Sequence, residues 1–502
     1  MLPWKSIITL QKEAGCPVYL QIANAISLEI KKGHLGPGVK LPGTRQLSEL
    51  LEVHRITVVR AYEELDAQGW IELRPSQGSF TSTKLPEISP RELNGKQRPH
   101  TFAAATGYEL PVNTVIKNPA TPNRHIPGFH DGPDPRLVPV NEIAKAFRSV
   151  LLKKVNLKYT SYVDTSGVTR FRNILSLYLN DTRGLQTTFE NILITRGSTM
   201  GLYLLTRVLF NAGDAVVVGD TNYYYADRTF LDAGMELHRV PVDESGIDID
   251  AIELLCKRRK INAVYITSHH HYPTTVTLCA PRRIRLLALA EQHGFVILED
   301  DYDYDYHYLS SPILPLVSSD TRGMVVYIGT LSKTISPAMR TGYIIAPPNL
   351  ILELARLRQI VDAQGDPILE LALCDLFEDG TVKRLMKKAL HEYRLRRDFL
   401  CENLATRFAG LIDFKVPDGG LAVWAKFDKS FPLPQLSERM KGQGFILPNG
   451  LIHNTGSTTL NATRMGFGFM TLEECGKALD VLEKIMKGPH WTIPLLETGP
   501  TR

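Results

Sequence analysis

The sequence predicts an α/β protein with a small N-terminal unit and a large unit built around a mostly parallel sheet. Its 502 residues are more than one compact core usually holds. Proline-rich, polar sequence without helical or strand periodicity follows residue 84, and beyond it strand-like apolar runs alternate with helical segments. That alternation is typical of parallel strands connected by helices. We therefore expect an N-terminal unit over 1–84, a linker over 85–126 and an α/β unit over 127–490.

The strands of the expected sheet are short apolar runs. They cover 192–194, 215–218, 263–266, 296–298, 325–328 and 342–345. Helical segments such as 199–210 and 282–293 lie between them. From about residue 373 to residue 488 helices predominate, with a few strands, which predicts a smaller C-terminal α+β lobe.

Composition excludes several classes of protein. A hydrophobic content of 43% and a charged content of 22% are ordinary for a globular chain, and a net charge of +5 requires any nucleic-acid surface to be local. The six cysteines form neither a CxxC pair nor a disulfide framework, so we expect reduced thiols. The start, MLPWKS, lacks the pattern of a signal peptide, and no apolar stretch is long enough to cross a membrane. We expect a cytoplasmic protein.

The N-terminal unit has the layout of a helix-turn-helix. Apolar residues recur on one helical face over 18–32. Thr44 is expected to cap a helix that runs to about Leu51, and a second helix is expected over 54–68, ended by Gly69. The sequence WIELRPSQGSFTS then predicts a β-hairpin with a glycine at its tip, which is the wing of a winged helix-turn-helix.

Basic and hydroxyl side chains gather at the start of the second helix, the end that enters the DNA major groove in this motif. Arginine can form bidentate hydrogen bonds with guanine edges or phosphates, and threonine can donate to a phosphate. The alternative is that Arg55 and Arg60 only solvate a surface helix. The order and spacing of the elements favour DNA binding. The residues expected to contact DNA are Arg45, Arg55, Thr57, Arg60 and Gly78.

The run from Leu41 to Phe80 resembles the winged helix of GntR-type bacterial regulators. Their usual pattern is LPSxRxLA, then SRxTVxxAYxxLxxxG, then a wing with glycine at its tip. Gly43 and His54 stand where that pattern usually has serine. The resemblance implies that the partner of this module is double-stranded operator DNA.

The segment YIGTLSKTISPAMRTGYIIAP contains a lysine beside groups that suit a phosphate. Lys333 follows a predicted strand, and Thr330, Ser332 and Arg340 accompany it. Hydroxyls and a guanidinium beside one amine can bind a phosphorylated aldehyde. Pyridoxal 5'-phosphate (PLP) needs a lysine for its Schiff base, an acid for its pyridine nitrogen, and donors for its phosphate. We therefore predict PLP as the cofactor, with Lys333 as the Schiff-base lysine.

The strand VILEDDYDYDY ends in an acidic cluster at the edge of the sheet where α/β proteins bind ligands. We expect Asp300 to hold the pyridine nitrogen and Tyr302 to donate to the ring hydroxyl. A metal site built from these aspartates and from nearby histidines is the competing interpretation. It is weaker, because three successive histidines in an extended chain cannot all face one centre.

Two further segments are expected at the cofactor. In TRGSTMG a strand runs into a helix, so the backbone amides near Ser198 and Thr199 point at an anion. Tyr223 in GDTNYYYADR can stack on the cofactor ring. From spacing alone, packing of Tyr223 in the core fits almost equally well.

From about residue 127 to residue 488 the chain resembles fold-type I aminotransferases, and the order of its modules resembles the MocR/GabR family of GntR regulators. In YTSYVDTSGVTRFR, the resemblance implies that Tyr162 reaches the phosphate of the neighbouring subunit. In NATRMGFG, it implies that Arg464 receives the α-carboxylate of an amino acid. Tyr225 stands where the GABA-sensing members carry a second carboxylate-binding arginine, so GABA is not the expected ligand.

The expected function is that of a PLP-dependent transcriptional regulator. It would sense PLP, an amino acid or an amine through an internal aldimine on Lys333, at the nucleoid of a bacterial cytoplasm. The alternative is an active aminotransferase with an auxiliary DNA-binding unit. We favour regulation, in which the aminotransferase-like unit is used mainly as a sensor; this leaves room for a residual half-reaction of transamination. A homodimer is expected, because fold-type I sites are completed across a subunit interface and paired DNA half-sites suit two-fold symmetry.

Overall fold

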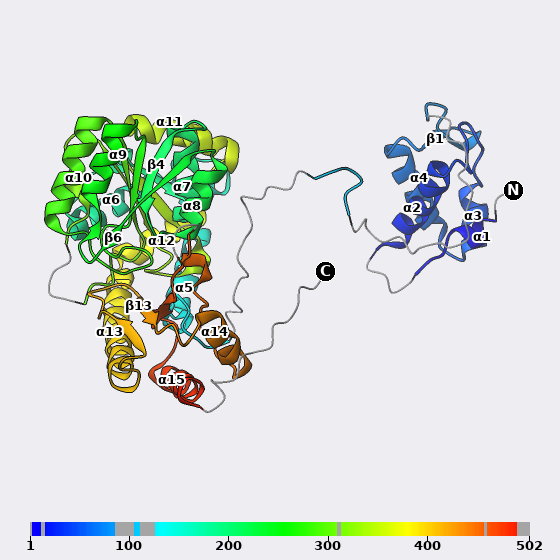
Figure 1. Ribbon diagram of the computed structural model, residues 1–502. Helices are drawn as coiled ribbons and strands as arrows, with labels where there is room; N and C mark the ends of the chain where they lie inside the picture. Colours follow the sequence, from blue (N-terminus) through cyan, green and yellow to red (C-terminus); the bar gives the residue numbers. More distant parts are fainter. Residues whose placement is uncertain are drawn as a thin grey trace. The chain divides into compact units, whose positions relative to one another are not determined.

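The computed structural model describes residues 3–11, 16–85, 105–110, 126–308, 313–455 and 459–488 (Figure 1). The chain divides into two compact units on either side of residue 111, and each is described by itself. Apart from 85, 105–110 and 126, the predicted linker lies outside the described residues. Within the described ranges, no helix has both the length and the apolar character needed to cross a membrane.

The N-terminal unit is a winged helix-turn-helix. Its elements are α1 (Trp4–Ile7), α2 (Val18–Lys31), α3 (Thr44–Leu51), α4 (Arg55–Ala67), β1 (Ile71–Arg74) and β2 (Gly78–Thr81). Ile22 and Ile26 of α2, Leu47 of α3, and Val58 and Leu65 of α4 are all fully buried in one core. The apolar face predicted for the first helix is therefore the face that packs.

The ends of these helices bear out one capping prediction and correct another. Thr44 does not cap α3: the N-cap is Gly43, whose extended backbone precedes the helix, and Thr44 is already the first helical residue. Its hydroxyl instead accepts a hydrogen bond from Arg55 Nε at 3.4 Å. Gly69 follows α4 with a φ of +76°, which is the glycine-favouring conformation expected at a helix end. Gly78 begins β2 directly after the turn of the wing.

The large unit is organised by a seven-stranded sheet. Its strand order is β3 (Ile192–Thr195), β11 (Gly342–Ile345), β10 (Val325–Thr330), β9 (Val296–Asp301), β8 (Ala263–Ile266), β4 (Ala215–Gly219) and β5 (Glu236–Val240). All neighbours are parallel except β11, which is antiparallel to both β3 and β10. The predicted mostly parallel sheet and its six predicted strands are confirmed.

Helices cover both faces of this sheet (Figure 1). The covering helices are α6 (Thr169–Arg183), α7 (Ser198–Leu209), α8 (Tyr224–Asp232), α9 (Ile249–Arg258), α10 (Ala280–His293), α11 (Pro348–Val361) and α12 (Pro367–Glu378). Helix α5 (Val140–Leu152) packs against α12. A separate short ribbon is formed by β6 (Val242–Asp243) and β7 (Gly246–Ile247). Ile192 and Ile194 of β3 pack with α6 and α12, whereas Leu193 between them packs with α7 and α11. Burial on both faces explains why the central strands are continuous apolar runs.

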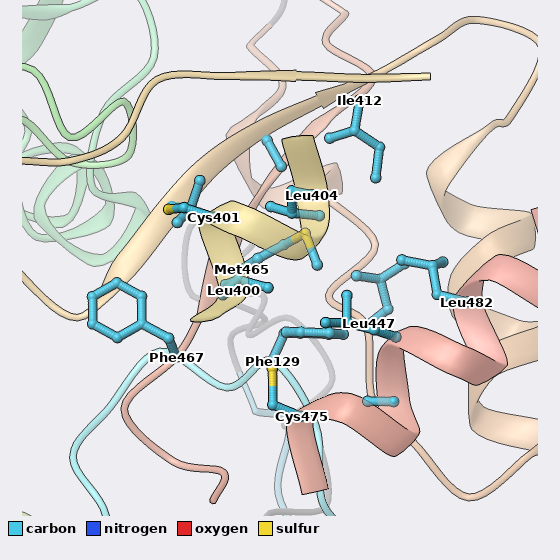
Figure 2. Packing of buried hydrophobic residues seen from close by; sticks show 14 of the residues in the cluster. Phe129, Leu400, Cys401, Leu404, Ile412, Leu447, Met465, Phe467, Cys475 and Leu482 are labelled. Carbon is cyan, nitrogen blue, oxygen red and sulfur yellow. The ribbon is translucent and has the colours of Figure 1, made fainter. Parts of the chain in front are cut away.

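The C-terminal lobe is an α+β unit, as predicted. It contains α13 (Thr381–Arg407), β12 (Ile412–Phe414), β13 (Ala422–Phe427), α14 (Leu433–Gly442), β14 (Ala462–Gly466) and α15 (Leu472–Lys487), with the strands in the order β12-β13-β14. Phe129, from the start of the large unit, packs among its core residues (Figure 2). The Phe129 carbonyl accepts a hydrogen bond from Gly466 N at 3.2 Å. This contact brings the residues after Phe129 beside β14.

Candidate functional site

Lys333 lies in the turn that follows β10, at the carboxyl edge of the sheet. Its side chain is half-buried, and Nζ donates to the Asp131 backbone carbonyl at 3.5 Å. Tyr306 donates its hydroxyl proton to the Lys333 carbonyl at 2.5 Å, which fixes the backbone of the turn. The lysine amine is therefore held at the edge where open α/β sheets bind ligands.

Asp300 lies at the end of β9, in register with Ile328 of the neighbouring β10. The Tyr265 hydroxyl donates to Asp300 Oδ2 at 2.9 Å, while Oδ1 is buried and has no hydrogen-bond partner among the described residues. Burial raises the pKa of Asp300 to about 7, and the charges of Asp301 and Asp303 act in the same direction. A buried carboxylate with one free oxygen is suited to a cationic N–H donor, such as a protonated pyridine.

The residues predicted to form an anion cradle lie where β11 meets the start of α7. Ser198 and Thr199 are the first residues of α7, and Gly197 precedes them with a φ of +82°. A Cβ on Gly342 would lie 2.7 Å from Gly197 Cα and 2.9 Å from Ser198 N. Only glycine fits this approach. The first amides of α7 have no partner within the helix, so they are suited to an anion.

Three more predicted residues surround this cradle. The Arg340 guanidinium lies against Gly197 and donates from Nη2 to the Arg196 carbonyl at 3.0 Å. Thr330 Oγ1 accepts a hydrogen bond from Ser332 N at 3.1 Å. Ser332 Oγ is buried without a partner in the described part of the chain. An unpaired buried hydroxyl is costly unless a ligand, such as a phosphate oxygen, completes it.

The predicted aromatic residues lie beside the same site. Tyr223 is the N-cap of α8, and its ring contacts the Tyr272 ring edge-on at 5.1 Å between centroids. Burial raises the pKa of the Tyr223 hydroxyl, and the nearby Asp300 adds to this rise. Tyr302 donates its hydroxyl proton to the His270 carbonyl at 3.2 Å. The hydrogen bond predicted from Tyr302 to a hydroxyl of the cofactor stays a prediction. It would require the Tyr302 hydroxyl to rotate away from the His270 carbonyl.

Each of the three guanidinium nitrogens of Arg464, in β14, forms a hydrogen bond. Its Nε and Nη2 lie 3.0 and 3.2 Å from the two carboxylate oxygens of Asp131, and Nη1 donates to the Pro273 carbonyl at 3.2 Å. The side chain of Arg464 is 3% exposed and that of Asp131 is 27% exposed. Burial would raise the pKa of Asp131, but Arg464 and Lys333 together hold it below its ordinary range. The group predicted to receive a ligand carboxylate therefore already holds one.

The histidines do not gather at one centre. They have separate partners: His269 Nδ1 lies 3.2 Å from Asp301 Oδ2, His270 Nδ1 lies 2.8 Å from Asp303 Oδ1, and His271 Nδ1 lies 2.8 Å from Thr274 Oγ1. Over the described ranges, no group of three or more histidine, cysteine, aspartate or glutamate side chains could hold a metal ion. The competing metal interpretation therefore has no site in this part of the chain.

These residues fit PLP. The free oxygen of Asp300 suits the pyridine nitrogen, and the unpaired hydroxyl of Ser332 suits a phosphate oxygen. The close approach of Gly342 to the start of α7 fixes the backbone whose first amides would bind the phosphate. Sequence reasoning missed Tyr265 and Asp131. Side chains alternate between the two faces of a strand, so the position of Tyr265 on β8, beside β9, could have placed it near Asp300. Nothing in the sequence places Asp131 beside Arg464.

The N-terminal unit presents the predicted DNA-contacting residues at its surface. Arg45, Arg55, Arg60 and Gly78 are exposed, and Thr57 is half-buried at the start of α4. Sequence reasoning missed Ile56, which is 62% exposed between two of these residues. An exposed isoleucine at the start of a recognition helix can contact the methyl group of thymine.

Tyr162 and Tyr225 lie at the surface of the large unit. Tyr162 is 86% exposed and follows the 3-10 helix η3 (Lys154–Thr160). This leaves its side chain accessible to a second subunit, although its predicted phosphate contact stays a prediction. Tyr225 is 42% exposed, and its ring contacts that of Tyr223.

Comparison with known families assigns both units. Residues 131–481 match aminotransferase class I and II, and residues 18–81 match the gntR family of bacterial regulatory proteins. The chain is 27% identical over 448 residues to the probable rhizopine catabolism regulatory protein MocR of Rhizobium meliloti, which covers 87% of each chain. It is 28% identical over 360 residues to aromatic-amino-acid aminotransferase 1 of Thermococcus litoralis, covering 71% of this chain and 86% of that one.

Among solved structures, the fold is similar to that of the kynurenine aminotransferase of Pyrococcus horikoshii. The TM-score is 0.67 at 25% sequence identity, over 72% of this chain and 90% of that chain. The match therefore covers the large unit, and the fold-type I prediction is confirmed.

Proposed function

Because the chain belongs to the aminotransferase class I and II family and carries a gntR-type unit ahead of that domain, we propose that it is a PLP-dependent transcriptional regulator. One observation carries the proposal: a helix-turn-helix with exposed arginines and a PLP-compatible site occur in the same polypeptide. Occupancy of the large unit by PLP, or by PLP and an amine or amino acid, would change the affinity of the N-terminal unit for DNA. Such linkage requires the ligand to bind the two DNA-binding states with different affinity.

The large unit supplies residues for each part of PLP. When bound, PLP supplies an aldehyde that combines reversibly with amines. Lys333 provides the amine that anchors it, and Asp300 holds the proton of the pyridine nitrogen. The amides of Ser198 and Thr199 and the guanidinium of Arg340 bind the phosphate. Tyr223, held beside Asp300, covers the ring.

The N-terminal unit would bind operator DNA in the cytoplasm, at the bacterial nucleoid. Arg55 and Arg60 are exposed at the helix end that enters the major groove, and nothing acidic precedes Glu63 on that helix. We assign base or phosphate contacts to these arginines and to Thr57. The wing, which begins its second strand at Gly78, would contact the flanking backbone.

A homodimer would complete both functions. Exposed apolar side chains cluster on α5 and η3: Val140 is 64% exposed, Leu151 56%, Leu152 71%, Val155 72% and Leu157 62%. Apolar side chains gathered in this way are typical of a protein interface. Val140 also lines a cavity of about 490 Å³ whose lining includes Arg340. A partner packed on this surface would approach the phosphate cradle, and the exposed Tyr162 of one subunit could then reach the other.

A mobility-shift assay with the upstream region of its own gene tests the proposal. The full chain is assayed alone, with PLP, and with PLP plus a panel of amines and amino acids. We expect a specific shift whose dissociation constant changes on addition of PLP or ligand. Absence of a specific shift under every condition would sink the proposal.

An active aminotransferase is the second candidate, favoured by the presence of Lys333, Asp300 and Arg464 and by the similarity to the Thermococcus litoralis enzyme. The two functions differ in turnover. Transfer of amino groups from an amino acid to a keto acid at about 1 per second or faster would favour the enzyme. Conversion of at most one equivalent per site would favour the regulator.

A further inference from the structure

The arginine of this site is occupied from within the chain. Asp131 contacts Arg464 through both carboxylate oxygens, at 3.0 and 3.2 Å, which is the geometry a ligand carboxylate would adopt. Burial alone would lower the pKa of Arg464, but Asp131 raises it above its usual value. The third guanidinium nitrogen is bound by the Pro273 carbonyl. A carboxylate ligand would therefore have to displace Asp131 or bind beside its negative charge.

The backbone keeps Asp131 in this position. Gly466, two residues after Arg464, donates to the carbonyl of Phe129, two residues before Asp131. Phe129 itself is fully buried in the core of the C-terminal lobe (Figure 2). Asp131 also lies beside the reacting lysine, because its backbone carbonyl accepts from Lys333 Nζ at 3.5 Å. An amine that approaches Lys333 therefore meets Asp131.

Tyrosine rings surround the same place. The Arg464 guanidinium lies 4.6 Å from the centroid of the Tyr272 ring and 5.9 Å from that of Tyr302. Tyr272 contacts Tyr223, which in turn contacts Tyr225. Aromatic faces attract cations and give no attraction to a carboxylate. The rings of Tyr272 and Tyr302 already hold the Arg464 guanidinium. Because Arg464 is also paired with Asp131, this side of the site offers little attraction to a ligand carboxylate, whereas the Asp131 carboxylate attracts an amine.

We propose that Asp131 is the specificity-determining residue of this site and that the ligand is an organic amine without an α-carboxylate. Asp131 acts as an internal substitute for the carboxylate of an amino acid, and the amine nitrogen of the ligand approaches Lys333 beside Asp131. The inference rests on the proposed function and narrows its ligand to one chemical class. In this role Asp131 selects between amines and amino acids as ligands.

The first test compares matched pairs on full-chain protein supplied with PLP. L-phenylalanine is compared with 2-phenylethylamine, and L-alanine with ethylamine, by the change in visible absorbance on titration. We expect each amine to bind at least 10-fold more tightly than its amino acid, and this preference to fall at least 10-fold in Asp131→Asn. Asp413→Asn removes an exposed carboxylate elsewhere on the C-terminal lobe and should leave the preference unchanged.

The second test uses PLP-free protein, so that failure of PLP binding does not obscure the result. Calorimetric titration with 3-phenylpropionate measures affinity for a carboxylate alone. We expect a gain of at least 10-fold in Asp131→Asn over the unaltered protein, and loss of that gain in Asp131→Asn/Arg464→Gln. Carboxylate affinity unchanged by Asp131→Asn, or an amino acid that binds the unaltered protein as tightly as its amine, would overturn the inference. Absence of cofactor absorbance on addition of PLP would instead count against the proposed function.

Discussion

Replacing Asp300 by asparagine should stabilise the PLP-free protein at alkaline pH. Burial raises the pKa of Asp300 from its ordinary 3.8 to about 7. The folded chain therefore binds one more proton than the unfolded chain between these values, and its stability falls as the pH rises through this range. The rise in pKa corresponds to about 4 kcal/mol above pH 7. The unpaired amide donor of the asparagine would cost about 2 kcal/mol, which leaves a net gain of about 2 kcal/mol.

Thermal unfolding of the PLP-free full chain at pH 5 and at pH 8 checks this prediction. At pH 8 we expect the transition of the large unit to lie a few degrees higher in Asp300→Asn than in the unaltered protein. At pH 5 the unaltered carboxyl is largely protonated, so the advantage should disappear. PLP at about 100 times its dissociation constant should add about 2.7 kcal/mol to the unaltered protein and less to the variant. An identical pH dependence in the two proteins would refute the reasoning.

Three further substitutions probe other parts of the molecule. In a mobility-shift assay, Arg55→Ala should weaken operator binding by about 10- to 100-fold. Arg394→Ala, which removes the same charge from the large unit, should leave operator binding unchanged. Equal effects of the two substitutions would contradict a contact between α4 and DNA. Gly342→Ala should weaken PLP binding in an absorbance titration, because its Cβ would lie 2.7 Å from the backbone beside the phosphate cradle; an unchanged affinity would contradict that placement. Tyr62→Phe should lower the free energy of unfolding of the N-terminal unit by about 1 kcal/mol, since the buried hydroxyl donates to a backbone carbonyl at 2.7 Å. An unchanged midpoint of urea unfolding in this variant would argue against that contribution.

Local patterns in the sequence were sufficient for the architecture. The central strands are buried on both faces and so appear as short apolar runs, and all six predicted runs are strands of the sheet. The edge strand β5 was missed, because its sequence ELHRV is only partly buried and carries charged residues. The misplaced cap at Thr44 was a shift of one residue, since a glycine with extended backbone can precede a helix as well as a threonine can.

The residues of the candidate site could be predicted where they lie in one segment of the sequence or in adjacent strands. They could not be predicted where two segments far apart in the sequence come together. Lys333 and Arg340 belong to one segment around β10 and β11, and Asp300 lies one residue before the end of the neighbouring strand β9. The pairing of Asp131 with Arg464 joins residues 333 positions apart, through a contact that exists only after the C-terminal lobe has folded around Phe129. No periodicity or spacing carries that information.

The central claim is that the state of the Lys333 site controls DNA binding, and the most direct measurement is the operator affinity of the full chain and of Lys333→Ala, each with and without PLP. Fluorescence anisotropy of a labelled fragment from upstream of its own gene gives the four dissociation constants at one salt concentration. We predict that PLP changes the dissociation constant of the unaltered protein at least 5-fold, the lower end of ordinary allosteric coupling, and leaves that of Lys333→Ala unchanged. Equal DNA affinity with and without PLP in the unaltered protein, or an equal response in the variant, would contradict the account.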